Sequence, residues 1–166
     1  MFNQDNDPRR PRPPSDSRGF FMLPQAPMDS GYYVYGNLYQ RPAKGAYQYA
    51  HPLMMTAILN VGLEWQAMDT RRFGVGDISL PGGIKTPDHG GHKSGLNVDI
   101  RPLRKDGREE PVKWSDPEYD QVATYALINL FHIFAQVQRV IFNDPGIPFL
   151  VRAERHDDHF HLDLRG

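Results

Sequence analysis

The sequence predicts an α+β fold in which a small, mainly antiparallel sheet is flanked by helices. Two short segments, 96–100 and 159–164, alternate apolar and polar residues, as strands with one buried face do. The segments follow the order helix, strands, long helix, strands, rather than a regular alternation of strand and helix. A chain of 166 residues suffices for one domain with a sizeable core.

The N-terminal segment differs in composition from the rest of the chain. Prolines at positions 8, 11, 13 and 14 restrict the backbone and remove hydrogen-bond donors, and almost no apolar residue accompanies them. We therefore expect a disordered Pro/Arg-rich tail over residues 1–18 and one folded domain over 19–166. The tail has no apolar stretch of the roughly 7–15 residues found in a Sec signal peptide. Arg9-Arg10 resembles a twin-arginine start, but prolines occupy the place of the apolar run.

Two helices are expected within the domain, after an irregular segment over residues 19–50 with one short strand. Pro52 suits the first turn of a helix that continues to about Gln66 with a mostly apolar stripe. Pro117 opens a longer helix to about Val137, capped by Ser115 or Asp116.

The strands are expected between and after these helices. A short strand within 71–80 is closed by the Pro-Gly-Gly turn at 81–83, and residues 96–100 form the next strand. The long helix is followed by strands at 139–143, at about 148–154 and at 159–164.

Charge and composition exclude several classes of protein. The net charge of −1 does not fit a basic nucleic-acid binder. No run approaches the roughly 18 apolar residues of a membrane helix, so we expect no membrane insertion. The absence of cysteine excludes disulfides, thiolate nucleophiles and Cys-ligated zinc.

Ionisable residues share one face of two predicted strands. In 96–100, the apolar residues take one face and Asn97 and Asp99 the other. In 159–164, His159, His161 and Asp163 lie opposite the apolar face. If the two strands are neighbours in the sheet, Asp99 and the histidines converge.

His92 precedes Asp99 by seven positions, and Gly95 between them can supply a tight turn that brings the imidazole back over the strand. Two imidazoles and one carboxylate suit zinc, and three protein ligands leave a fourth position open, as in catalytic sites. Iron oxygenases use the same ligand types, but their first His and acid are usually two positions apart. The H-E-x-x-H helix of common zinc proteases is absent from this sequence.

These residues lie in two motifs that resemble those of the penicillin-insensitive murein endopeptidases. Residues 89–99 read HGGHKSGLNVD, similar to the family pattern H-x-x-H-x-x-G-L-x-V-D, and residues 156–161 read HDDHFH. The resemblance covers about residues 30–166. It implies a small antiparallel sheet with a single zinc site, as in the lysostaphin and D-Ala-D-Ala metallopeptidase group.

The resemblance implies a role for each matching residue. His92, Asp99 and His161 would bind one Zn²⁺, and His159 would be a catalytic histidine beside the metal. His156 would stand where related enzymes have an acidic general base.

Three further residues could take part in the same site. Glu154 is an alternative to His156 as the general base. His89 would line the site and contact substrate. Asp77 either hydrogen-bonds a ligand or closes a turn.

The expected function is hydrolysis of peptide cross-links in bacterial peptidoglycan, at the D-Ala–diaminopimelate bond or a neighbouring stem-peptide bond. The alternatives are a DD- or LD-carboxypeptidase acting on stem peptides and a non-catalytic zinc-binding module that recognises the cell wall. The expected partners are stem peptides and no nucleic acid. We expect action in the periplasm or cell wall, reached with a phage or a contact-dependent secretion system because no Sec signal is visible.

Overall fold

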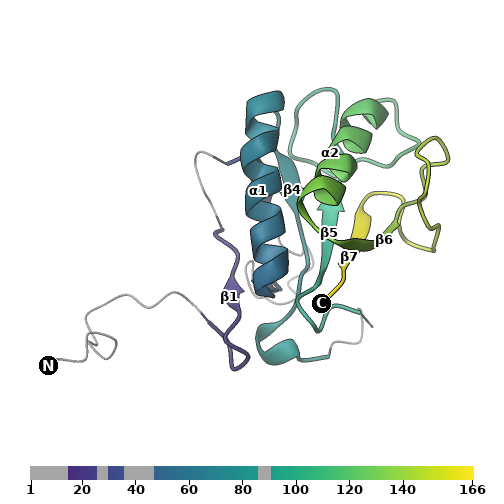
Figure 1. Ribbon diagram of the computed structural model, residues 1–166. Helices are drawn as coiled ribbons and strands as arrows, with labels where there is room; N and C mark the ends of the chain where they lie inside the picture. The colour runs from purple at the N-terminus through teal and green to yellow at the C-terminus, as the bar shows by residue number, and fades with distance from the viewer. Residues whose placement is uncertain (1–14, 26–29, 36–46, 86–90) are drawn as a thin grey trace, which may run out of the picture.

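The computed structural model describes residues 15–25, 30–35, 47–85 and 91–166. Their elements are β1 (Phe21–Met22), β2 (Tyr32–Val34), β3 (Tyr49–Ala50), α1 (Pro52–Met68), β4 (Phe73–Val75), the 3-10 turn η2 (Pro81–Gly83), β5 (Asn97–Arg101), α2 (Gln121–Phe134), β6 (Val137–Ile141) and β7 (Phe160–Leu164). This order of helices and strands confirms the predicted α+β class (Figure 1).

Within the described residues, five strands form the main sheet in the order β2-β4-β5-β7-β6. Only the pairing of β2 with β4 is parallel, so the sheet is mainly antiparallel, as predicted. A separate two-stranded sheet joins β1 to β3. The central strands β5 and β7 carry fully buried apolar residues, which are Val98, Ile100, Phe160 and Leu162.

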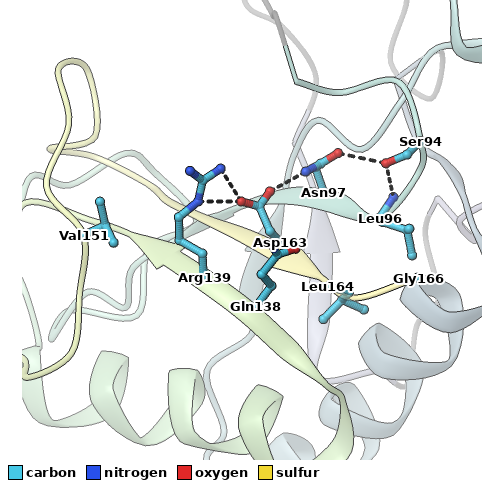
Figure 2. A pocket seen from close by; sticks show the side chains of 9 residues that line it. All are labelled: Ser94, Leu96, Asn97, Gln138, Arg139, Val151, Asp163, Leu164 and Gly166. Atoms are coloured by element: carbon cyan, nitrogen blue, oxygen red, sulfur yellow. Dashed lines mark hydrogen bonds and ion pairs between the residues drawn. The ribbon is translucent and has the colours of Figure 1, made fainter.

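The two helices pack against each other and cover the apolar face of the sheet (Figures 1 and 2). Helix α1 begins at Pro52, as expected, and the His51 ring caps it by accepting a hydrogen bond from the Leu53 amide at 3.2 Å. Its buried stripe includes Ile58 and Trp65. None of the described helices is long and apolar enough to span a membrane.

The second helix is shorter than its sequence predicted. It begins at Gln121, where the Asp120 carboxylate accepts from the Ala123 amide at 3.0 Å. Asp116, one of the two predicted caps, instead closes a turn by accepting from the Lys113 amide. The C-terminal end was also misplaced, because the chain from Val137 onward pairs with β7 as β6.

The strand predicted at 148–154 was wrong. In this segment Val151 makes an isolated bridge to Ile141, and Phe149 adopts a positive φ of 66° that interrupts an extended chain. The segment is therefore a loop that leads from β6 towards β7.

The chain before β1 contains an ordered turn. Arg18 donates to the Asp16 carboxylate, to Ser79 Oγ at 2.9 Å and to the Leu80 carbonyl at 3.0 Å, and it also contacts the Lys93 carbonyl. Residues 15–18, which we assigned to the tail, thus have defined partners. Residues 1–14 of that predicted tail lie outside the described residues.

Candidate metal centre and active site

The sheet brings the two predicted ionisable faces together. Strands β5 and β7 are antiparallel neighbours, and their register places Asp99 directly opposite His161. Partners in adjacent strands have Cβ atoms roughly 5 Å apart on the same face. The Nδ1 of His161 consequently lies 2.8 Å from Asp99 Oδ1.

His92 reaches the same point from the loop before β5. Gly95 has a φ of +72°, and a Cβ at this position would lie 2.6 Å from the His51 amide nitrogen. Glycine therefore allows the tight turn that the sequence suggested. The Nδ1 of His92 lies 3.1 Å from the Ile78 carbonyl, and its Nε2 lies 3.3 Å from Asp99 Oδ2.

The ligand atoms of His92, Asp99 and His161 all lie within 4.8 Å of one another, and all three residues are buried. Ligands around tetrahedral zinc are roughly 3.3 Å apart, given bonds of about 2.0 Å. The distal nitrogens of both imidazoles face acceptors, namely the Ile78 carbonyl and the Asp163 carboxylate. If each distal nitrogen carries the proton, the inner nitrogens present lone pairs towards Asp99. Such a set of converging acceptors fits a cation.

The electrostatics of this cluster favour positive charge. Burial would raise the pKa of Asp99, but the neighbouring His92 and hydrogen bonds from the histidines hold this pKa well below its usual range. Burial opposes the protonation of His161, yet hydrogen bonds to Asp163 and Asp99 outweigh it and raise its pKa to about 9. The carboxylates thus stabilise positive charge at the position where a metal would bind.

His159 lies beside the three candidate ligands. Its Nε2 is 4.0 Å from Asp99 Oδ1, and its Nδ1 is held by Asp158 at 2.9 Å. Burial works against protonation of His159, but the hydrogen bond to Asp158 and the negative charges of Asp99 and Asp158 together outweigh it and raise the pKa. Its side chain is 24% exposed, so the ring stands at the surface of the site, where a substrate could reach it.

His156 is the next ring outward, 4.9 Å from His159 between ring centroids. Its Nδ1 lies 2.7 Å from the Glu154 carbonyl, which leaves Nε2 as the acceptor when the ring is neutral. Burial lowers the pKa of His156, which favours this neutral form. Glu154 is exposed, and its backbone carbonyl makes this contact.

Asp163 is a part of the site that sequence reasoning did not assign. Its carboxylate lies 2.8 Å from His161 Nε2, accepts from Arg139 Nε at 2.7 Å and contacts the Asn97 amide group (Figure 2). Asp163 is 5% exposed. The alternation of 159–164 had placed it on the metal face, but its partners depend on the pairing of β7 with both β5 and β6.

An open pocket of about 630 Å³ lies over this network, on the face of the sheet away from the helices (Figure 2). It is lined by Ser94, Leu96, Asn97, Gln138, Arg139, Val151, Asp163, Leu164 and Gly166. Because Asp163 contacts His161, the pocket adjoins the metal centre on the side of the His161 Nε2 atom.

The two predicted substrate contacts have different outcomes. The Asp77 carbonyl accepts from the Asp99 amide at 3.0 Å, so Asp77 lies next to the strand that carries the candidate ligand. A role for its side chain in substrate binding stays a prediction. His89 lies outside the described residues.

The sequence model of one family, described as penicillin-insensitive murein endopeptidase, matches residues 34–144. The chain belongs to this family. The matched region contains His92 and Asp99 and ends before the histidines of 156–161, which the fold brings to the same site. Comparison with curated proteins gave no match. Membership of the murein endopeptidases supports peptidase activity on cell-wall peptidoglycan.

Proposed function

We propose that this murein endopeptidase is zinc-dependent and cleaves the D-Ala–diaminopimelate cross-link or a neighbouring stem-peptide bond. The observation that carries the proposal is the buried convergence of His92, Asp99 and His161 in a chain of this family. Two imidazoles and a carboxylate match the donor preference of zinc and leave a position open for chemistry.

When bound, zinc would polarise the scissile carbonyl and activate water near neutral pH. The chain's own residues would hold it in place. The Ile78 carbonyl and the Asp163 carboxylate fix the orientation of the His92 and His161 rings, respectively. Hydrogen bonds of this kind, from a metal-binding histidine to a second residue, usually increase the affinity for the metal.

His156 is our choice for the general base. The Glu154 carbonyl orients the ring so that Nε2 can accept a proton from the attacking water. The lowered pKa of His156, caused by burial, keeps the ring neutral before the reaction. His156 would then deliver the proton to the leaving amine. A group in this position typically contributes roughly 10²–10⁴-fold to the rate.

His159 would act on the transition state. Burial lowers its pKa, but the hydrogen bond to Asp158 and the charges of Asp99 and Asp158 together raise it, which favours a protonated ring. This charge, beside the candidate ligands, would stabilise the oxyanion that develops on the scissile carbonyl. Asp158 keeps the His159 Nε2 directed at the cluster.

A digest of purified, cross-linked peptidoglycan tests the function. Mass spectrometry should find fewer cross-linked species, more monomers and intact glycan chains. Trimming of uncross-linked stem peptides alone would favour the carboxypeptidase alternative. Asp99→Ala should abolish the activity, and removal of zinc by a chelator should do so reversibly. New reducing sugar ends would contradict peptide-bond cleavage.

A further inference from the structure

Arg101 is a cation on the metal face of the sheet with no assigned role. It is the last residue of β5, two positions after Asp99, so the two side chains project from the same face. Their Cα atoms are roughly 6.6 Å apart, given a rise of about 3.3 Å per residue. Despite its charge, Arg101 is only 9% exposed.

Two tyrosines and two glycines form the surroundings of Arg101. The guanidinium carbon lies 3.9 Å from the centroid of the Tyr35 ring. Tyr35 lies over Gly74 and Gly76, where a Cβ on Gly76 would come within 2.4 Å of the ring. Burial raises the pKa of Tyr33, and the neighbouring Arg101 counteracts this rise. Gly74 of β4 and Gly76, just after it, thus make room for an aromatic support beneath the guanidinium.

The charge of Arg101 has no carboxylate partner. Among the described residues, no acidic oxygen lies within 4.0 Å of its guanidinium, and its one backbone acceptor is the Glu109 carbonyl at 3.4 Å. Five other arginines of the described residues, in contrast, have a carboxylate at 2.5–2.6 Å, and they are Arg18, Arg71, Arg72, Arg104 and Arg139. A largely buried cation without an anion is unfavourable, unless a ligand supplies the anion.

The charge of Arg101 acts on Asp158, the residue that holds His159. The pKa of Asp158 is lowered chiefly by its hydrogen bond with His159, and the charge of Arg101 lowers it further. The Tyr35 hydroxyl lies 3.5 Å from the Asp99 carbonyl, which ties the support of Arg101 to the strand of the candidate ligand. Arg101 therefore flanks the metal centre rather than a remote surface.

We propose that Arg101 binds the free carboxylate of the residue that follows the scissile amide. This inference rests on the proposed function. In a D-Ala–diaminopimelate cross-link, the carbon attached to the amide nitrogen carries such a carboxylate. The carboxylate carbon lies three bonds from the scissile carbonyl carbon, at a distance of roughly 3–4 Å. The guanidinium of Arg101, which lies two positions after Asp99 on the same face of β5, can reach this carboxylate. The planar guanidinium can donate two parallel hydrogen bonds to the two carboxylate oxygens.

The inference predicts selectivity for charge beside the scissile bond. A substrate with a carboxamide in place of the carboxylate would offer the guanidinium a single neutral acceptor and no negative charge. Because a hydrogen bond between two charged groups is stronger than one to a neutral acceptor, we expect the full-length, zinc-loaded enzyme to favour the carboxylate substrate by roughly 10–100-fold in kcat/KM.

The test uses a synthetic cross-linked stem-peptide dimer and the same dimer with that one carboxylate converted to carboxamide. Arg101→Met should lose most of the preference, with little change for the carboxamide dimer. Arg101→Lys, which retains the charge, should keep part of the preference. Arg72→Met is the matched control, because it removes an equal charge from a half-exposed arginine paired with Glu109.

Binding provides a readout that does not depend on catalysis. In calorimetry with the metal-free full chain, the wild type should bind the carboxylate dimer at least 10-fold more tightly than the carboxamide dimer, and Arg101→Met should bind both alike. Equal loss for both dimers in the variant would assign Arg101 a structural role and overturn the inference. If the wild type cuts neither dimer, the proposed function fails, and the binding preference alone decides the role of Arg101.

Discussion

The contact between Asp163 and His161 gives the sharpest prediction about the metal centre. Three donors meet at the Asp163 carboxylate: His161 Nε2 and the Asn97 amide at one oxygen, and Arg139 at the other. Asp163→Asn keeps the shape but offers one acceptor and one NH₂ group. At least one donor must then lose its partner, and the charge that orients the His161 ring disappears.

The expected effect is a roughly 10–100-fold loss of zinc affinity, which is the usual result of removing such an outer contact. This corresponds to about 1.4–2.7 kcal/mol. The affinity can be measured by competition with a chromogenic zinc chelator, using the full chain.

Asp144→Asn is a suitable control, because Asp144 is a buried carboxylate that binds Tyr119 and Gln121 rather than a histidine. It should lower the unfolding temperature but leave the zinc affinity within about twofold. An unchanged zinc affinity in Asp163→Asn would refute the reasoning, and so would an equal loss in the Asp144 variant.

Three further predictions concern catalysis, stability and the site of action. His159→Ala should retain zinc by elemental analysis but lose roughly 10²–10³-fold in kcat, because the ring acts on the transition state; near-normal turnover would remove it from the mechanism. Burial opposes ionisation of Asp16, but hydrogen bonds from Arg18 and the Gly82 amide lower its pKa to about 2. Because this pKa is lower in the folded than in the unfolded state, the ionised carboxylate stabilises the fold above about pH 4. Asp16→Asn should therefore cost up to about 2 kcal/mol in urea unfolding at pH 6, and the difference should vanish as the pH falls towards 2. When directed to the periplasm of a bacterium, the enzyme should cause lysis that Asp99→Ala abolishes; toxicity of that variant would point to a target other than the wall.

Much of the candidate site could be predicted because its signals are local. Alternation along 96–100 and 159–164 shows which side chains share a face, and this depends only on the period of a strand. The resemblance of the two motifs to those of the murein endopeptidases then indicated His92, Asp99 and His161, whose ligand atoms the structure brings within 4.8 Å of one another. The errors in α2 and at 148–154 have a different origin. Helix α2 is capped by Asp120 and not by Asp116, so it begins later than predicted. In the segment 148–154, the positive φ at Phe149 interrupts the predicted strand.

By itself, the sequence determined the fold class, the two ionisable faces and the candidate ligands, because periodicity and motif spacing are properties of neighbouring residues. The tertiary structure alone decided which residues support them. Asp163 contacts Arg139 through the pairing of β6 with β7. Arg101 packs on Tyr35 because Gly74 in β4 and Gly76 just after it leave space for the ring. These contacts join residues far apart in the chain, and strand register, which no local pattern specifies, sets them.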